Sequence, residues 1–451
     1  MKTLSRIMFI ISGPVLAGGA GSVQAQDWPQ WRGPNRDGKA AVFTAPKTWP
    51  KALTQKWKVT VGDGVATPSL VGDKLYVFAR QEGGEIIRCL NAATGDEIWK
   101  EKYDAQGADG PAGSFSGPRC SPAVAEGKVV VLGVRGALVC LDAATGKVAW
   151  RKDDFPGALP RFYTSASPVI LNGMCIAQVG GRDKGGIVAY DLAKGDEKWK
   201  WTGDAPAYAS PVLMTIGDAK LVVAQTETKM VALNAADGKL VWEAPFKVEG
   251  RGYNAATPIV SGQTIIYTGS NRGTTAVKLE KEGDGYAAKE LWKNPDVSVQ
   301  FNSPILKDGF VYGLSARNEL FCLNAADGKT AWTAPSAPPA PNAAPEARPA
   351  DAPPPPPDGP GAGRRPGGPG GGRGMRGGGG GGYGSIVDAG SVLIALTPSS
   401  QLIVFQPGGK AYTEVARIKV ADSPTHAYPV VSGNRIITKD KDSVTLWTVD
   451  G

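Results

Sequence analysis

The sequence predicts an all-β protein, an eight-bladed β-propeller of four-stranded antiparallel blades closed by an N-terminal strand. Three observations predict it. A tryptophan recurs every 40 to 51 residues, a Ser-Pro or Thr-Pro dipeptide precedes most copies, and a small-residue turn ending in Gly stands just before the Trp. Self-similarity at this period is typical of propellers. The recurring residues are Trp57, Trp99, Trp150, Trp199, Trp242, Trp292 and Trp332.

The first repeat shows how one blade is built. Its inner strand follows Thr67-Pro68. Pro can begin a strand because the backbone nitrogen at that position does not donate a hydrogen bond within the sheet. Apolar, β-branched runs at 74–78 and 86–90 predict the second and third strands. The turn at 91–95 begins with Asn and ends with Gly, which together favour a tight turn. The outer strand then ends at Trp99.

The same pattern recurs along the chain. The inner strands of the next five blades follow Ser121-Pro122, Ser167-Pro168, Ser210-Pro211, Thr257-Pro258 and Ser303-Pro304. Two weaker copies follow, at about 385–418 and from Tyr428-Pro429 to 451, and the last has no fourth strand. Trp57 lies in a strand that has no blade before it. Residues of about 54–61 are therefore predicted to complete the eighth blade, which leaves no open seam.

The seven tryptophans are interpreted as blade-docking residues. Each ends an outer strand and offers a large flat face to the neighbouring blade, near the turn Gly of the next repeat. Burying an indole is worth about 2–3 kcal/mol. Ligand stacking is the alternative role for these side chains.

The first 25 residues have the pattern of a cleaved signal peptide. Lys2 and Arg6 precede an apolar core, and small residues at positions 23 and 25 predict cleavage after Ala25. We therefore expect a periplasmic or secreted protein, with no transmembrane segment in the mature chain. The net charge of +8 is diffuse, so no nucleic-acid partner is expected.

The remaining chain divides into four parts. Residues 26–53 are expected to form an N-terminal strap on the propeller, and 54–334 hold the closing strand with blades 1 to 6. Residues 335–383 are Pro/Ala-rich and then Gly/Arg-rich, a composition that predicts a disordered insert. Blades 7 and 8 occupy 384–451. Arg-Gly segments also occur in RNA-binding tails, but contact with an anionic wall polymer or lipid suits an exported chain better.

Cysteine and histidine usage predicts no metal site. Cys89, Cys140 and Cys322 occupy one repeat position, so they are expected to be small buried strand residues and not a disulfide framework. No Cys-x-x-Cys-His haem motif is present. The chain has one histidine, His426, too few for a His-built zinc centre.

The repeat resembles the PQQ-type repeat of quinoprotein β-propellers. The resemblance rests on Leu-Asn/Asp-Ala-x-x-Gly-Lys-x-x-Trp preceded by Ser-Pro, and it covers about 55–451 apart from the insert. The related proteins include quinone-dependent alcohol and sugar dehydrogenases and the outer-membrane barrel-assembly propellers, which bind proteins. The dehydrogenases use adjacent cysteines, calcium ligands and an Asp base. This sequence has no Cys-Cys pair, and no positions match the calcium ligands. The segment 27–38 also resembles the mature N-terminus of exported PQQ-like propeller proteins.

The candidate binding residues lie where connections enter the inner strands, because these loops surround the mouth of the central channel. Arg, Tyr, Asn and His side chains in such a ring suit an anionic or sugar-like ligand. Ordinary loop packing is the alternative, and for His426 it is a packed or solvated side chain. The candidates are Arg119, Arg161, Tyr163, Tyr208, Arg251, Asn254, Asn302 and His426, with Tyr253 and Phe301 nearby.

These features favour a binding or scaffold module in the cell envelope over an enzyme, and no catalytic residue is assigned. We expect a monomer that binds an envelope protein or polysaccharide and holds no cofactor. One alternative is an oxidoreductase that uses PQQ with calcium on alcohols or sugars. A second alternative is a polysaccharide-binding envelope protein. Fold alone does not decide among them.

Overall fold

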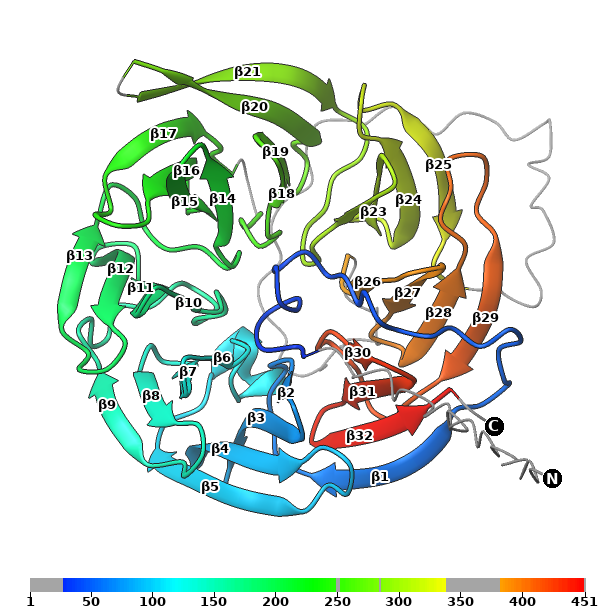
Figure 1. Cartoon of the computed structure of the whole chain (residues 1–451), viewed down its shortest axis with the longest axis horizontal. Helices are drawn as coiled ribbons and strands as arrows, with labels where there is room; N and C mark the ends of the chain where they lie inside the picture. Colours follow the sequence, from blue (N-terminus) through cyan, green and yellow to red (C-terminus); the bar gives the residue numbers. More distant parts are fainter. Residues whose placement is uncertain (1–26, 249–251, 284, 338–381, 450–451) are drawn as a thin grey trace, which may run out of the picture.

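The computed structural model describes residues 27–248, 252–283, 285–337 and 382–449. Within them, eight four-stranded antiparallel sheets form the blades of a closed ring (Figure 1). This confirms the predicted eight-bladed propeller. The leader with its cleavage site after Ala25, the candidate Arg251 and most of the 335–383 insert lie outside the described residues.

Blades 1 to 4 follow one another along the chain, each with its innermost strand first. Blade 1 is β2 (Ser69–Val71), β3 (Lys74–Gln81), β4 (Gly84–Asn91) and β5 (Glu97–Asp104). Blade 2 is β6 (Ala123–Ala125), β7 (Lys128–Leu132), β8 (Leu138–Asp142) and β9 (Val148–Lys152). Blade 3 is β10 (Val169–Leu171), β11 (Met174–Gly180), β12 (Gly185–Asp191) and β13 (Glu197–Trp201). Blade 4 is β14 (Val212–Ile216), β15 (Ala219–Gln225), β16 (Lys229–Asn234) and β17 (Leu240–Pro245).

Blades 5 to 8 repeat this order, and a short 3-10 helix, η1 (Gly110–Phe115), precedes blade 2. Blade 5 is β18 (Ile259–Ser261), β19 (Thr264–Thr268), β20 (Thr274–Glu282) and β21 (Gly285–Asn294). Blade 6 is β22 (Ile305–Lys307), β23 (Phe310–Leu314), β24 (Glu319–Asn324) and β25 (Thr330–Pro335). Blade 7 is β26 (Ser385–Ala389), β27 (Val392–Leu396), β28 (Gln401–Phe405) and β29 (Glu414–Lys419). Blade 8 is β30 (Val430–Ser432), β31 (Arg435–Lys439) and β32 (Ser443–Thr448), with β1 (Thr54–Thr60) outermost.

The ring closes through β1, as the position of Trp57 predicted. β1 pairs antiparallel with β32, from Thr54 opposite Thr448 to Thr60 opposite Ser443. An N-terminal strand thus supplies the outer strand that the last repeat lacks. Since both ends of the chain share one sheet, the ring has no unpaired seam.

The repeat tryptophans lie at the blade interfaces. Trp99 is half-buried, its indole N–H donates to the carbonyl oxygen of Ala143 at 3.2 Å, and its ring lies under the turn glycine Gly146 of the next blade. The bond recurs around the ring from Trp57 to Ala92, Trp150 to Leu192, Trp199 to Ala235, Trp292 to Ala325 and Trp332 to Gly408. Trp242 is buried among apolar side chains of blades 4 and 5. These indoles contact the neighbouring blade and its turn.

The Ser-Pro and Thr-Pro dipeptides form an inner ring of hydrogen bonds around the channel. The backbone N–H of Ser167 donates to the hydroxyl of Ser210 in the next blade, at 2.9 Å. The same link joins Ser121 to Ser167, Ser210 to Thr257, and Thr257 to Ser303. Blade 7 has no such dipeptide, and Tyr428 spans it: its hydroxyl accepts from the N–H of Ser303, and its own N–H donates to Thr67. We name these residues the hydroxyl ring.

The strap, residues 27–53, crosses the centre of the ring (Figure 1). Trp28 is fully buried and pairs with Leu70 of blade 1. Trp31 donates its indole N–H to Thr257 of the hydroxyl ring at 3.2 Å. Arg32 and Arg36, 1% and 2% exposed, reach carbonyl oxygens at the starts of inner strands in blades 6 and 3. The strap therefore ties together blades that are far apart in the sequence.

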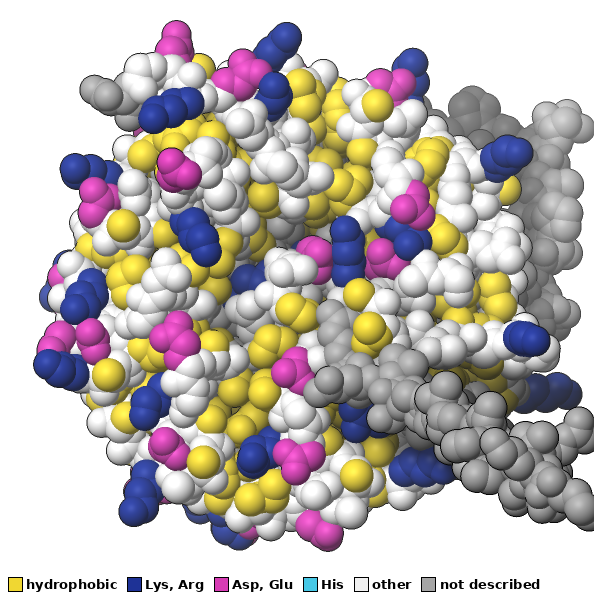
Figure 2. Space-filling model, viewed as in Figure 1, with side chains coloured by type: hydrophobic (Ala, Val, Ile, Leu, Met, Phe, Trp, Pro, Cys, Tyr) yellow, Lys and Arg dark blue, Asp and Glu magenta, His cyan; other side chains and the backbone are white. Residues whose placement is uncertain are grey.

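The two faces of the propeller differ. The turn face carries the tight turns between first and second strands and between third and fourth strands, and the strap crosses it. Around that face, Lys/Arg and Asp/Glu side chains of the described residues intermingle without a patch of one sign (Figure 2). The mouth face carries the connections between blades and the loops between second and third strands. In the part of the chain that the structure describes, no helix has the length and hydrophobicity needed to cross a bilayer.

Candidate functional site

An arc of aromatic rings surrounds the channel on the mouth face. Seven of the connections between blades each contribute one partly exposed ring. The contacts run in order: Tyr208 to Tyr253 at 5.8 Å, Phe162 to Tyr253 at 4.9 Å, Tyr253 to Phe301 at 6.4 Å, Phe301 to Tyr383 at 4.3 Å, Tyr383 to His426 at 5.2 Å, and His426 to Phe115 at 4.7 Å between ring centroids. We name these seven residues the aromatic arc.

The arc is open at the eighth connection, between β1 and β2. That loop contributes no ring, and its Asp63 carboxylate instead accepts hydrogen bonds from the backbone N–H and the hydroxyl of Ser116, both at 2.6 Å. The bonds hold the loop that carries Phe115 against the start of blade 1. Aromatic rings that meet edge to face or offset attract one another, so the arc is a coherent surface.

His426, one of the predicted candidates, is packed between two rings of the arc. Phe115 and Tyr383 meet it edge-on, at interplanar angles of 75° and 80°. Burial lowers the pKa of His426 to about 4, so the imidazole is neutral at pH 7. Burial likewise raises the pKa of Tyr383. His426 thus behaves as an aromatic member of the arc.

Arg119 and Tyr163 lie together beside the arc. The Arg119 guanidinium is 6.0 Å from the centre of the Tyr163 ring and donates to the carbonyl oxygens of Ala112 and Phe115. Burial lowers the pKa of Arg119. The Tyr163 hydroxyl donates to the carboxylate of Asp109 at 2.6 Å. Tyr163 has a φ of +67°, a left-handed conformation that is rare for an aromatic residue.

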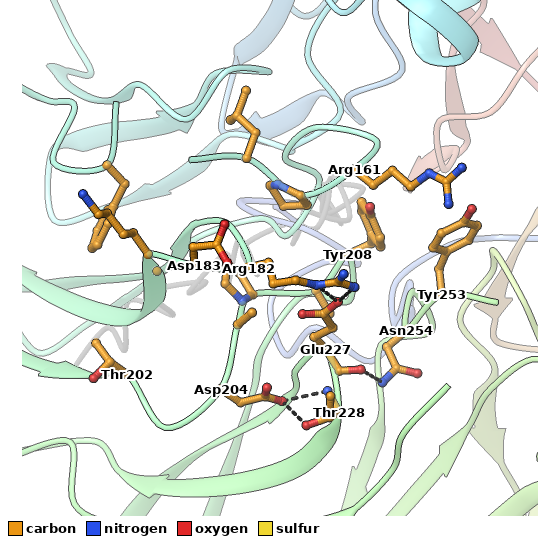
Figure 3. A pocket seen from close by; sticks show the side chains of 18 of the residues that line it. Arg161, Arg182, Asp183, Thr202, Asp204, Tyr208, Glu227, Thr228, Tyr253 and Asn254 are labelled. Atoms are coloured by element: carbon orange, nitrogen blue, oxygen red, sulfur yellow. Dashed lines mark hydrogen bonds and ion pairs between the residues drawn. The ribbon is translucent and has the colours of Figure 1, made fainter. Parts of the chain in front are cut away.

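A hollow of about 1300 Å³ lies beside the arc, over blades 3 and 4 and the connections that flank them. Three of the predicted candidates line it, namely Arg161, Tyr208 and Asn254, together with Tyr253. Figure 3 shows these side chains with Arg182, Asp204 and Glu227, which project from neighbouring loops. Burial raises the pKa of Tyr208, whose hydroxyl accepts a hydrogen bond from the backbone N–H of Phe162 at 3.0 Å.

The two candidate asparagines hold loops in place. The Asn254 amide nitrogen donates to the carbonyl oxygens of Thr226 at 2.8 Å and of Glu227 and Phe246 at 3.1 Å. The Asn302 amide nitrogen donates to Leu314 at 2.6 Å and to Gly382 at 3.1 Å. Both residues are buried. Their amide N–H groups are occupied by backbone, so their contribution to a ligand site is to fix the loops beside it.

Several residues of the mouth face could not be predicted from the repeat pattern of the sequence. Tyr208, Phe301 and His426 each stand three residues before the Pro that precedes an inner strand, but Tyr383 precedes blade 7, which lacks that Pro. Phe115 lies in a longer connection and does not occupy this position. Arg182 and Glu227 belong to loops between second and third strands, whose lengths vary between blades. An aromatic residue in nearly every connection is the signal that would have revealed the arc.

The propeller and its mouth face can be compared with known proteins. Residues 82–334 match a protein family described as outer membrane protein assembly factor BamB. The chain belongs to this family. The BamB of Xanthomonas campestris is 24% identical over 268 residues, which cover 56% of this chain and 62% of that protein. A quinohemoprotein alcohol dehydrogenase of Comamonas testosteroni is 31% identical over 139 residues, which cover 30% of this chain and 19% of the enzyme. The chain spans less than two thirds of the length of either relative.

Solved structures show the fold that the BamB family shares with the quinoprotein enzymes. BamB from Moraxella catarrhalis superposes with a TM-score of 0.58 at 14% identity, covering 88% of this chain and 98% of that one. The Comamonas testosteroni enzyme superposes with a TM-score of 0.66 at 15% identity, covering 94% of this chain and 81% of that one. At these identities the likeness shows the propeller architecture alone.

The side chains of this BamB-family chain do not fit a calcium-held quinone. Among the described residues, no group of three or more His, Cys, Asp or Glu side chains could hold a metal ion. The five cysteines are free and buried, and no two are adjacent in sequence. Carboxylates on the mouth face such as Asp63 and Asp204 accept hydrogen bonds from neighbouring loops, whereas a calcium site requires oxygen ligands clustered around one point.

Proposed function

We propose that the chain is a binding or scaffold module of the cell envelope, which engages its partner through the mouth face. The single observation that carries the proposal is the aromatic arc: seven partly exposed rings in continuous contact on the face opposite the strap. Exposed aromatic side chains are enriched where proteins bind partners, because they bury large areas at little entropic cost.

Two further observations support an envelope role. The first 25 residues have the pattern of an exported chain. The matching family carries the description outer membrane protein assembly factor BamB. A propeller suits such a role because its rigid ring presents several loops on one face. The partner is expected to be an envelope protein or a polysaccharide, and the chain itself a monomer in the periplasm or outside the cell.

Retention of envelope components on the immobilised full chain tests this function. A double variant, Phe301→Ala with Tyr383→Ala, removes the stacked pair of the arc, which we expect to abolish retention of the specific component. Leu291→Ala is the matched control, because this apolar side chain is 43% exposed on the outer strand β21. Equal retention by the arc variant and the wild type would contradict the proposal, and so would no specific retention by the wild type.

The enzymatic alternative has its own measurement. Since the residues do not fit the calcium-held cofactor, adding PQQ with Ca²⁺ is expected to leave the cofactor's absorption spectrum unchanged. No dye reduction with alcohols or sugars is expected either. A saturable spectral change accompanied by dye reduction would instead establish a dehydrogenase.

A further inference from the structure

The hollow over blades 3 and 4 carries positively charged side chains that no described residue pairs with. Arg161, Lys184 and Lys247 are exposed on its rim, and each comes from a different loop. The structure gives none of these three side-chain cations a hydrogen bond or an ion pair with a described residue. The guanidinium of Arg161 lies 5.5 Å from the centre of the Phe162 ring. These cations are therefore free to meet an anion.

The carboxylates of the hollow are mostly engaged by protein groups. Glu227 accepts from the Nε of Arg182 at 2.9 Å, and Asp154 accepts from the Tyr190 hydroxyl at 2.9 Å. Asp204 accepts three hydrogen bonds, from the Thr226 hydroxyl and from the N–H and hydroxyl of Thr228. Asp183 accepts no hydrogen bond from a described residue, although its charge raises the pKa of the neighbouring Arg182. Five cations and four carboxylates of the described residues line the hollow, so the lining carries one excess positive charge, and the three cations above are those without a hydrogen-bond or ion-pair partner.

Aromatic rings stand at the end of the hollow nearest the channel (Figure 3). Tyr253 lies perpendicular to Tyr208, at an interplanar angle of 90°, and nearly perpendicular to Phe162, at 84°. Arg161 is next to Phe162, so a guanidinium and a cluster of partly exposed rings share one end of the site. This places an anion-binding group beside surfaces that favour C–H contacts.

The shape and lining of the hollow favour a carbohydrate over a peptide. Loop residues form most of the wall, and among the lining residues only Gly185 of β12 and Lys200 of β13 come from strands, which leaves little strand edge for an extended peptide. A helix requires a continuous apolar groove, whereas charged side chains interrupt the apolar residues of this lining. A volume of about 1300 Å³ exceeds the roughly 300–1,000 Å³ of a small-molecule pocket, which leaves room for several sugar units.

We propose that this hollow binds an acidic oligosaccharide, a chain of uronic-acid units. Arg161, Lys184 and Lys247 pair with the carboxylates, and Tyr253 and its neighbouring rings pack against the C–H faces of the sugars. The proposal rests on the binding function above and identifies the chemistry of one ligand. Guanidinium groups are well suited to it, because their planar fork matches a carboxylate.

Calorimetric titration of the full chain with three hexamers tests the proposal. The probes are hexagalacturonate, the neutral sugar maltohexaose, and hexaglutamate as an acidic peptide. We expect hexagalacturonate to bind at least ten times more tightly than either other probe. Its affinity should fall as salt is raised, because charge pairing contributes. Equal binding of hexaglutamate would show recognition of charge without sugar and overturn the proposal, and so would equal binding of maltohexaose or no binding of hexagalacturonate.

Single variants locate the site. Arg161→Ala and Tyr253→Ala are each expected to weaken hexagalacturonate binding at least tenfold. Lys147→Ala is the control, because Lys147 is an exposed cation in the β8–β9 turn on the turn face. Unchanged affinity in both site variants, with the fold intact by circular dichroism, would also overturn the proposal.

The two proposals can fail separately. The retention experiment uses Phe301→Ala with Tyr383→Ala, which lie outside the lining of the hollow. If hexagalacturonate does not bind but an envelope component is still retained through the arc, the sugar assignment is wrong and the binding function stands. If hexagalacturonate binds and no component is retained, the scaffold role fails while the sugar site remains.

Discussion

Arg36 of the strap donates a hydrogen bond to the carbonyl oxygen of Ser167, at 2.9 Å. Ser167 also accepts a hydrogen bond on its hydroxyl from the N–H of Ser121 in the preceding blade. The N-terminal strap and the hydroxyl ring therefore meet at Ser167, as they also do at Thr257 through Trp31. Because both are buried around the channel, substitutions in the strap or in the hydroxyl ring are expected to change the free energy of unfolding of the whole propeller.

The two strap arginines are expected to differ in their importance for stability. Arg36 donates to Gln30, Ser167 and Pro168 at 2.9–3.0 Å, whereas Arg32 has a short bond to Pro304 and a long one, 3.4 Å, to Asp37. Replacement by Met keeps the volume and removes the charge. We expect Arg36→Met to lower the free energy of unfolding by about 2–3 kcal/mol.

Arg32→Met is the comparison. Two nitrogens of Arg32 but one of Arg36 are buried without a hydrogen-bond partner among the described residues, and burial lowers the pKa of both side chains. Removing the charge of Arg32 recovers desolvation free energy, so the loss in stability should be about 1 kcal/mol or less. Urea unfolding of both variants measures the difference. A larger loss for Arg32→Met than for Arg36→Met would contradict this account of the strap.

Alanine substitution at two glycines distinguishes the cost of backbone strain from the cost of disturbing the contact between blades. Gly146 and Gly127 have φ values of +74° and +71°, so alanine is strained at either position. A Cβ on Gly146 would lie 2.5 Å from Cε3 of Trp99, whereas a Cβ on Gly127 would meet nothing within 4 Å. We expect Gly127→Ala to cost about 1–2 kcal/mol and Gly146→Ala at least about 2 kcal/mol more. Thermal unfolding of both variants checks this prediction. Equal losses of stability would mean that Trp99 moves away from the new Cβ without a cost in free energy.

The architecture could be predicted from sequence because it is carried by local repetition. Two features indicated the closing strand: Trp57 recurs in the outer-strand position without a blade before it, and the last repeat has no fourth strand. The repeat Pro also placed Tyr208, Phe301 and His426 on one face. These inferences need only the period and the alternation of strands.

The contacts across the channel could not be predicted in the same way. Nothing local indicates that Arg36 reaches Ser167, 131 residues away, or that Tyr428 spans the blade without a Ser-Pro. The segment 27–38 was expected on the surface of the propeller. It instead crosses the channel with Trp28 and both arginines buried, because carbonyl oxygens at the starts of inner strands are available there.

The hydroxyl ring explains why Ser or Thr precedes the repeat Pro, and it can be tested at Ser210. The Ser210 hydroxyl accepts from the buried N–H of Ser167 at 2.9 Å. Ser210→Ala leaves that N–H without a partner, which should lower the free energy of unfolding by about 1–3 kcal/mol. Ser210→Thr retains the acceptor, as at Thr67 and Thr257, and should cost less than Ser210→Ala. A similar loss for both, by urea unfolding, would indicate that packing and not the hydrogen bond matters at this position.

The burial of His426 predicts a pH dependence of folding stability that arises from this one side chain. Burial lowers its folded-state pKa to about 4, while an unfolded histidine titrates near 6.5. Between pH 6.5 and pH 4 the unfolded chain therefore binds more protons than the folded one, so stability falls as the pH falls through this range. The loss attributable to His426 is at most about 3 kcal/mol and is complete below pH 4.

Since the chain has one histidine, a single imidazole resonance reports the titration. We expect its NMR midpoint near pH 4 in the folded protein. His426→Phe keeps a ring between Phe115 and Tyr383, and the unfolding free energy of the wild type relative to the variant should rise by up to about 3 kcal/mol as the pH rises from 4 to 6.5. Carboxylates titrate in the same range, but they are common to both proteins and cancel in the difference. A midpoint near 6.5 would mean that the imidazole is solvated and that the arc is open at His426.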